Sequence, residues 1–427
     1  MTSPTAAGRV PRTVWVLAVV GFLIAVGFGV MSPVLPVYVR LFGVSSFLVG
    51  LVVSAFAVVR LVSNPVGSAL LRVLGPRNVV IAGCCLIAVT TFLMGVSNSY
   101  AAILLWRGLS GVGSALYGVG SLALVFAVTP AGFRGRANAL VGGGFSLGGM
   151  AGPAIGGLVA GYSIHAPFFF YAVTLAAAAL LVTVTVPRRA SDGGRDDGRD
   201  DGARDGEGAR DPAGPGVADG GRDPRDPAPS SRTSARATLR HYLRDRRYVA
   251  CLAVNFAHSW QSYGVRSLLV PLFIVETLGL TTAHTGWAFT AAAIAQFACL
   301  APAGWATDKA GRRPTLVVGL VTLAAVATGL ALTRSYAVLV VLLCLYAVGA
   351  AATGASVQAL LGDAVPATAG PALAAYQMAG DAGLILGPLV AGALIDVLPM
   401  AVAWSVGAAL LLAATVLVLR PHTPLPS

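Results

Sequence analysis

Residues Gly148–Gly157 read Gly-Gly-Met-Ala-Gly-Pro-Ala-Ile-Gly-Gly, inside an uncharged stretch that runs from 137 to 160. In water this would be a poor helix, because relative to Ala a Gly in a helix interior costs about 1 kcal/mol and a Pro about 3 kcal/mol. In a bilayer the backbone must satisfy its own hydrogen bonds, so a helix persists there despite these residues. Small residues four apart also leave a flat strip that another helix can approach closely. The stretch therefore predicts a membrane-spanning helix in tight contact with a neighbour.

The same pattern returns in the second half of the chain. Residues Gly383–Gly392 read Gly-Leu-Ile-Leu-Gly-Pro-Leu-Val-Ala-Gly, and Gly387-Pro388 follow Gly152-Pro153 at a distance of 235 positions. A second set of residues has the same offset: Ser32, Pro36 and Tyr38 correspond to Ser267, Pro271 and Phe273. Repetition at a fixed offset indicates two similar structural units.

The composition points to the bilayer as the main partner. The chain has 427 residues, of which 56% are hydrophobic and only 11% are charged, whereas soluble domains carry about 25% charged residues. The net charge of +12 does not indicate a nucleic-acid partner, because the arginines lie mostly in short loops between apolar runs rather than on one basic face. We expect most of the surface to face lipid.

Apolar runs long enough to span a bilayer, about 20 residues each, number twelve. They lie near 13–37, 46–70, 78–97, 101–127, 136–160, 166–186, 249–275, 284–306, 314–333, 336–361, 370–395 and 399–419. The sequence thus predicts an all-α membrane protein with twelve transmembrane helices in two pseudo-symmetric six-helix bundles. The expected divisions are a tail at 1–12, a bundle at 13–187, a disordered linker at 188–246, a bundle at 247–420 and a tail at 421–427.

Charge placement predicts the orientation. Arginine or lysine lies at alternate loops and before the first run, at Arg9, Arg12, Arg72, Arg77, Arg134, Arg136, Arg188, Arg189, Lys309, Arg312, Arg313 and Arg420. The other loops hold little more than Arg40 and Arg334. Because positive charge is retained on the cytoplasmic side, we expect a multi-pass protein of the cell membrane with both termini and the linker in the cytoplasm.

Carboxylates are almost absent outside the linker. No Asp or Glu precedes Asp192, and eleven of the seventeen acids lie between 190 and 238. The remaining acids are Asp245, Glu276, Asp308, Asp363, Asp381 and Asp396. Only Asp381 falls near the middle of a span. The five cysteines all lie within apolar runs, without metal-ligand spacing, so we expect no metal and no cofactor.

Four stretches, each on the appropriate span, resemble motifs of the major facilitator superfamily of transporters, and the resemblance covers both halves. They are Gly29–Pro33 with Pro36 and Tyr38, Leu105–Gly113, Gly148–Gly157 and Gly304–Arg313. The first and third resemble the twelve-span drug/proton antiporter group. The resemblance implies a secondary transporter with alternating access between two bundles, driven by the proton gradient and acting as a monomer. Its third motif implies that Gly148, Gly152, Pro153, Gly156 and Gly157 seal the outer side.

The resemblance also assigns a cytoplasmic gating loop. Its second-half copy is intact, with Gly304, Asp308, Lys309, Gly311, Arg312 and Arg313. The first-half copy begins at Gly67 but is degenerate, with Leu71 near the position of the family's Asp. We therefore expect a one-sided lock, in which Asp308 meets the start of the fifth span. For Arg312 and Arg313 the alternative is simple retention of positive charge on the cytoplasmic side.

Ionisable residues inside a membrane are costly and are functional candidates by default. For proton coupling these are Asp381 and Arg107, the latter matching the fourth-span Arg that the family associates with coupling. Arg60 and Arg266 are candidates for the substrate cavity, although Arg60 could instead pair with backbone or Asp381, and Arg266 could extend to water. Further polar and aromatic candidates for the cavity, each with ordinary helix packing as the alternative, are Trp260, Gln261, Tyr263, Gln296, Tyr376 and Gln377, with His258 on the same span as the first three.

These observations predict proton-coupled efflux of a small amphipathic drug or metabolite. An importer or uniporter on the same scaffold is the first alternative, because the first span lacks an acid. The other alternative, a multi-pass membrane sensor or enzyme, would need a folded soluble domain or a catalytic constellation, and the sequence shows neither. It shows no phosphate-binding loop with a Lys either, which disfavours ATP-driven transport.

Overall fold

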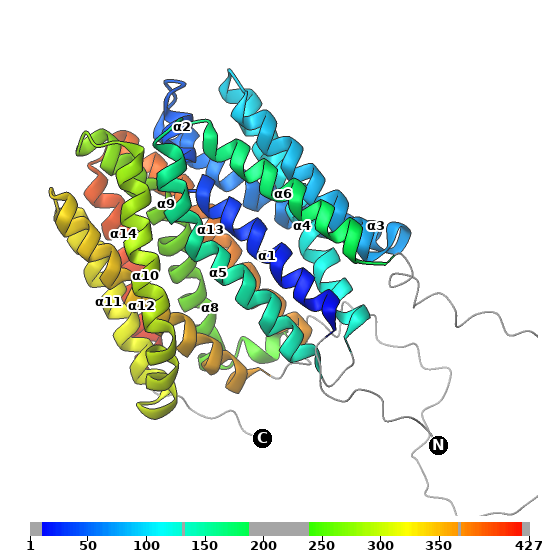
Figure 1. The fold of residues 1–427 in the computed structure, drawn as a ribbon. Helices are drawn as coiled ribbons and strands as arrows, with labels where there is room; N and C mark the ends of the chain where they lie inside the picture. The colour runs from blue at the N-terminus through cyan, green and yellow to red at the C-terminus, as the bar shows by residue number, and fades with distance from the viewer. Residues whose placement is uncertain (1–10, 130–132, 188–238, 366–368, 421–427) are drawn as a thin grey trace, which may run out of the picture.

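The computed structural model describes residues 11–129, 133–187, 239–365 and 369–420, and these ranges form an all-helical bundle without strands (Figure 1). The first half contains α1 (Arg12–Met31), α2 (Leu35–Arg40), α3 (Ser46–Gly95), α4 (Tyr100–Val128), α5 (Arg134–Ala160) and α6 (Ala166–Thr185). The second half contains α8 (Arg246–Ser259), η3 (Trp260–Val265), α9 (Arg266–Leu272), η4 (Phe273–Thr277), α10 (Thr282–Lys309), α11 (Arg312–Leu332), α12 (Tyr336–Ala364), α13 (Gly370–Val397) and α14 (Met400–Leu419). The two η segments are π-helical.

The helices account for the twelve expected spans. Nine helices of the described ranges are long and apolar enough to cross a membrane. One of them, α3, is 50 residues long and holds two spans, because Gly75 adopts φ +74° before Pro76 and turns the chain between them. The α5 helix and the continuous run from α8 to η4 supply the other two. Each predicted boundary lies within a few residues of the observed one, except that the first predicted span, 13–37, is divided into α1 and α2 by a break at residues 32–34.

Residues 239–245, which were expected to belong to the linker, lie within the described part of the chain. Residues 188–238 lie outside the described part of the chain, but 239–242 form a helical turn before α8. Leu239 and Tyr242 are partly buried against the core, and the Tyr242 ring lies 5.9 Å from that of Tyr248. Apolar side chains near the start of the second bundle thus order this turn, which composition alone had assigned to the linker.

The duplication reappears as two matching helix crossings. A Cβ built on Gly29 of α1 would lie 2.9 Å from the Cα of Gly152 on α5. In the second half, a Cβ built on Gly264 of η3 would lie 2.9 Å from the Cα of Gly387 on α13. Both pairs are offset by 235 positions. The small residues therefore create the same close backbone contact in each half, as Gly-rich spans in lipid do.

The short connections after the second and eighth spans are also equivalent. Gly75 and Gly311 both have positive φ, +74° and +98°. Two residues later, Arg77 donates to the carbonyls of Thr183 and Val186 at the end of α6, and Arg313 donates to those of Val418 and Arg420 at the end of α14. A cation at these unpaired carbonyls is favourable. Arg313 therefore ties helices together within its own half.

Counting back from these two glycines corrects one position of the degenerate loop. Asp308 lies three residues before Gly311, and the residue three before Gly75 is Arg72 rather than Leu71. The first-half loop therefore carries a cation at the position of the acid. The first half has one extra residue between Gly67 and Gly75, so counting forward from Gly67 leads to Leu71 instead.

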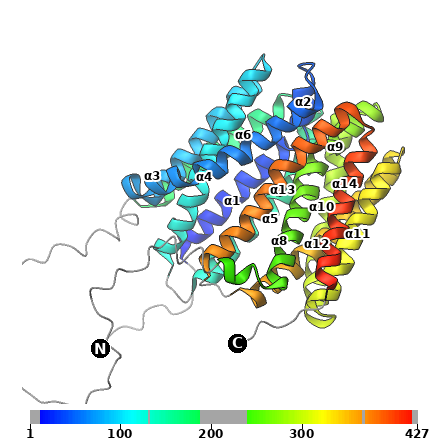
Figure 2. The ribbon, with the colours of Figure 1, turned by 180° about the vertical axis from the view of Figure 1, so that it is seen from behind.

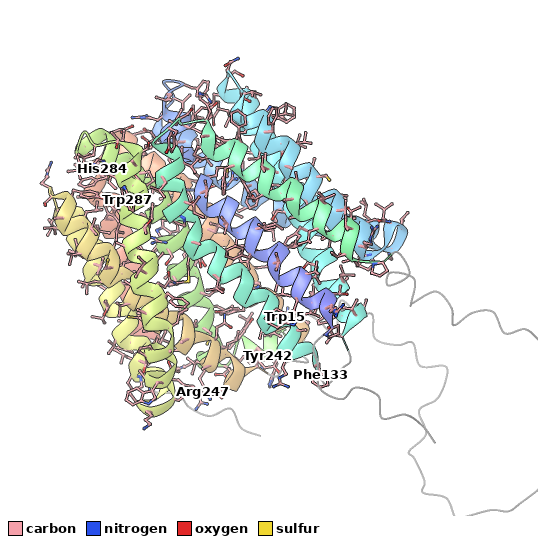
Figure 3. The ribbon with its side chains drawn as sticks, in the orientation of Figure 1. Trp15, Phe133, Tyr242, Arg247, His284 and Trp287 are labelled. Carbon is pink, nitrogen blue, oxygen red and sulfur yellow. The ribbon has the colours of Figure 1, made fainter. Side chains whose placement is uncertain are left out.

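The bundle has two distinguishable ends. We call the end with the start of α1, the end of α14 and the loops of Arg72 and Arg312 the arginine-rich end, and the other the distal end. Trp15 and Arg247 lie at the first, whereas His284 and Trp287 lie at the second (Figure 3). Trp15 and Trp287 are both exposed, as expected of tryptophans at the two membrane–water interfaces.

Candidate functional site

Two pairs of helices make the main contacts between the halves. The α13 helix of the second half packs against α3 of the first, and α10 packs against α5. Figure 2 shows α13 running beside the helices of the first half along the middle of the bundle. The surfaces between these pairs are where a rocking-bundle transporter carries its substrate, so the candidate site is built from the residues that face the junction.

The α3–α13 junction is closed at the distal end. Asp396 accepts hydrogen bonds from the backbone N–H groups of Ser46 (2.7 Å) and Phe47 (2.9 Å), which caps the start of α3 from the other half. About two helical turns further along α3, the Ser54 hydroxyl donates a hydrogen bond to the carbonyl of Ile385 at 2.7 Å. Exposed Arg40 and Glu276 form an ion pair between the halves at 2.7 Å. The distal ends of the halves are therefore locked together.

Arg60 and Asp381 form the innermost of these contacts. Arg60 Nη2 lies 2.7 Å from Asp381 Oδ1. The Arg60 side chain is 34% exposed and the Asp381 side chain 25%. Arg60 lies fourteen residues after the start of α3, about 21 Å along the helix, which is close to mid-membrane. Among the described residues, hydrogen bonds between the halves run from the distal end to this pair and no further. Of the two alternatives for Arg60, the structure shows the pair with Asp381.

Arg107 lies nearby but does not contact Asp381. The side chain is buried, and its guanidinium carbon lies 4.5 Å from the ring centre of Phe56 and 5.8 Å from that of Phe28. Aromatic faces attract a cation, which offsets part of the cost of its burial. Its Nε has no hydrogen-bond partner in the described structure. One turn later on α4, Gly111 packs against the backbone N of Arg60, so the two cations are held by adjacent turns of α3 and α4.

The glycines of the antiporter motif have two different partners. Gly148, Gly152 and Gly156 pack against Phe22, Gly29 and Val30 of α1, within the first half. Gly157 instead packs against α10 of the second half, where a Cβ on it would lie 2.7 Å from the Cα of Gly286. Pro153 lies against Gly29. Only the last glycine of the motif therefore contributes directly to the distal closure.

The gating-loop residues lie at the arginine-rich end. Arg312 forms an ion pair with Asp363 and donates to the carbonyl of Ala359 at 2.9 Å, both on α12. Lys309 lies 5.2 Å from the ring centre of Trp305, and Gly67 packs against α4. Asp308 is exposed. The side chain of Arg134, at the start of α5, lies outside the described side chains, so the contact between Asp308 and α5 stays a prediction.

The remaining cavity candidates divide into packed and exposed residues. Gln261 is fully buried against Gly407 of α14, and Trp260 is buried against α13 beside Phe256. Tyr376 is buried on α13 near Asn255. These three are packed within the second half in this structure, and their place in a substrate cavity stays a prediction. Tyr263 and Gln377 are exposed, and Gln296 is half-buried.

One polar row was not recognised as a unit. His258, Ser262 and Arg266 follow one another at intervals of four, and Ser262 also bonds to Tyr346 on α12 at 2.7 Å. The i, i+4, i+8 spacing could have revealed that these side chains share one helix face. The rings of Phe289 and Tyr346, whose centres lie 5.3 and 5.1 Å from the Arg266 guanidinium carbon, could not have been inferred as partners, because they come from other helices.

Comparison with known families settles the class of the protein. The sequence model of the Major Facilitator Superfamily matches residues 17–265 and again 251–427. The chain belongs to the major facilitator superfamily. The second match repeats the first over the second half, in agreement with the internal duplication. The chain is thus a multi-pass membrane protein of a transporter family, with the all-helical fold expected of it.

Curated relatives in this superfamily include drug-resistance proteins. The chain is 31% identical to the quinolone resistance protein NorA of Staphylococcus aureus (strain MRSA252) over 180 residues, which cover 40% of this chain and 45% of the relative. It is 27% identical to multidrug resistance protein 2 of Bacillus subtilis (strain 168) over 175 residues, 41% and 43% of the two chains. The matched region spans less than half the length of these relatives.

Solved structures share the fold over almost the whole chain. A D-xylose-proton symporter has a TM-score of 0.70 at 15% identity, covering 96% of this chain and 97% of its own. A bacterial homolog to the human lysosomal transporter Spinster, in an inward-facing and unoccupied conformation, has a TM-score of 0.68 at 14% identity, with coverages of 96% and 95%. These similarities establish the superfamily fold for both bundles.

Proposed function

We propose that the protein is a proton-coupled transporter that exports small amphipathic organic molecules across the cell membrane by alternating access. The observation that carries this proposal is the Arg60–Asp381 pair. It joins the two halves at mid-depth and contains the one carboxylate that the described residues place there. The resistance functions named for the relatives support efflux as the direction.

The pair gives a physical route to coupling. Ionised Asp381 attracts Arg60 of the other half, and this attraction holds the halves together at mid-depth. When Asp381 takes up a proton, the charge–charge attraction is lost and only a neutral hydrogen bond remains, which is roughly half as strong. Protonation therefore lowers the cost of separating the halves.

The expected orientation follows from the arginine-rich end, which we assign to the cytoplasm. In a cysteine-free background, Asn98→Cys at the distal end should react with an impermeant thiol reagent in intact cells, and Ala310→Cys should not. Both positions are exposed. Labelling of Ala310→Cys from outside would reverse the assignment of the arginine-rich end to the cytoplasm.

The decisive experiment uses proteoliposomes with an imposed proton gradient and a panel of cationic, neutral and anionic aromatic dyes. Gradient-driven accumulation should be lost in Asp381→Asn, while exchange of the same dye across the membrane without a gradient remains measurable. Asp245→Asn serves as the control, because it removes a carboxylate at the arginine-rich end and leaves an equally good capping residue at the start of α8. If Asp381→Asn still concentrates a dye against its gradient, proton coupling through this residue is ruled out.

A further inference from the structure

Arg266 is a membrane-embedded cation in an aromatic setting. It begins α9, directly after the π-helical segment η3, and is half-buried. Its guanidinium carbon lies 5.3 Å from the ring centre of Phe289 on α10 and 5.1 Å from that of Tyr346 on α12. Three helices of the second half therefore converge on this one charge.

The guanidinium turns toward the middle of the membrane rather than toward water. Arg266 Nε donates to the carbonyl of Ser262 at 3.2 Å, four residues back toward the arginine-rich end. An arginine that extends to the interface would direct its head group the other way, toward the distal end of α9. The backbone bond uses only Nε, and the two terminal nitrogens keep their hydrogen-bond donors available.

Hydroxyl groups and an imidazole continue the row. The Ser262 hydroxyl lies 2.7 Å from the Tyr346 hydroxyl and 3.4 Å from His258 Nε2. Ser262 and Tyr346 are buried, and His258 Nδ1 is buried with no hydrogen-bond partner in the described structure. The exposed ring of Tyr263 stands edge-on to His258 at 6.4 Å. The row thus combines one cation, several hydroxyl donors and an aromatic face.

No carboxylate of the described residues neutralises Arg266. Five of the six acids outside the linker are engaged elsewhere: Asp245 caps α8, Glu276 pairs with Arg40, Asp363 with Arg312, Asp381 with Arg60, and Asp396 caps α3. The sixth, Asp308, is exposed at the arginine-rich end. A cation in a membrane pairs with an acid or a backbone carbonyl, or faces a water-filled cavity. Arg266 has the Ser262 carbonyl and two rings, which leave its charge unneutralised and able to receive an anion.

The position of the row suits a substrate. Phe289 lies one helical turn inward from Gly286, the residue that closes the distal end against Gly157 of the first half. The Arg266 row therefore lies directly beneath the distal closure, near the surface where α10 meets the other half. A molecule that entered from the arginine-rich end would reach these groups last.

We propose that Arg266, with Ser262 and Tyr346, is a subsite for the carboxylate of an anionic amphipathic substrate, whose aromatic part packs on Phe289 and Tyr263. This inference rests on the proposed transport function and narrows it to a substrate class. A carboxylate fits the planar guanidinium with two parallel hydrogen bonds, and the apolar rings exclude water from them. A cationic substrate, by contrast, would place like charges together.

Equilibrium binding tests the subsite without any gradient. Purified protein in lipid nanodiscs is titrated calorimetrically with 2-naphthoate, 2-naphthamide and 2-naphthylmethylammonium, which share one ring system and differ in charge. We expect the carboxylate to bind at least ~10-fold more tightly than the amide, the scale of a charge-assisted hydrogen bond, and the ammonium most weakly. Arg266→Gln should reduce the carboxylate-to-amide ratio to near one.

Two variants keep the test independent of folding. Arg266→Lys retains the charge without the planar fork, and should keep only part of the preference. Arg334→Gln removes an exposed arginine of a distal loop and should leave all three affinities unchanged. Equal binding of the three probes, absence of naphthoate binding, or an unchanged preference in Arg266→Gln would overturn the proposal. Arg266-dependent binding in a protein that shows no proton-driven transport would instead refute only the proposed function.

Discussion

Three arginines within the membrane-spanning helices are stabilised in three different ways. Arg60 pairs with a carboxylate of the other half, Arg107 is enclosed by two phenylalanine rings, and Arg266 combines a backbone carbonyl with two rings. Only the first of these contacts joins the two halves. A change of protonation can therefore act on the junction at Arg60, whereas the other two charges are fixed within their own halves.

The Arg60–Asp381 pair makes a double-mutant prediction. Arg60→Gln leaves Asp381 without its cation in a partly buried site, and we expect the apparent stability in detergent to fall by about 1–2 kcal/mol, less than for a fully buried pair because both groups are partly exposed. Adding Asp381→Asn should recover most of that loss, since a neutral pair remains. Thermal unfolding of the parent, both single variants and the double variant measures the coupling.

Strict additivity of the two single losses would show that the pair contributes nothing as a pair. Arg40→Gln provides the comparison, because its exposed ion pair with Glu276 should be worth much less.

At the residue scale the sequence showed which charged residues lie within the membrane-spanning helices, but not toward which neighbour each polar side chain is directed. Arg60 and Asp381 stood out because ionisable residues are rare in these spans, and their pairing was one of two alternatives. Trp260 and Gln261 were candidates by residue type alone, and the sequence did not show that both would be buried at the start of the π-helical segment η3.

Among the helices, the repeated Gly crossings show that each bundle is held by the same close contact. The two halves are not copies in every respect, because Asp308 in one loop corresponds to Arg72 in the other. The sequence predicted which helices carry the small residues. It did not predict that Gly286 is the partner of Gly157, since Gly286 belongs to none of the recognised motifs.

The cap of α3 by Asp396 makes a prediction about this helix pair. Asp396→Ala removes a cap worth about 1 kcal/mol that exists only while the distal end is closed. This corresponds to a shift of about fivefold toward distal opening. In a common Ser54→Cys background without other cysteines, labelling from the distal side should speed up by that factor, because residue 54 is buried at the junction.

Asp245→Ala is the matched control, since Asp245 caps α8 within the second half through the N–H of Arg247. It should lower stability without changing the labelling rate. Equal acceleration in both variants would show that Asp396 stabilises its helix and not the closed state.

For the whole molecule, the described inter-half contacts lie at the distal end and at mid-depth, so this structure is the form closed at the distal end. The sequence indicated two bundles and alternating access through its duplication and motifs. It could not indicate which state the chain adopts, because both states use the same helices and differ in the contacts between them.

The Gly157–Gly286 crossing provides the last prediction, since it should limit closure of the entire distal end. A Cβ at Gly157 would lie 2.7 Å from the Cα of Gly286, whereas a Cβ at Gly149 on the same helix would meet open space. Both substitutions to Ala gain the same intrinsic helix propensity of about 1 kcal/mol, so the difference between the two variants isolates the effect of the crossing.

We expect Gly157→Ala to increase distal labelling of Ser54→Cys and to reduce dye transport at least ~10-fold, because backbone overlap costs more than about 1 kcal/mol. Gly149→Ala should match the parent in both assays. Normal transport and labelling in Gly157→Ala would mean that the halves close without this approach, and the seal would have to lie in the α3–α13 junction alone.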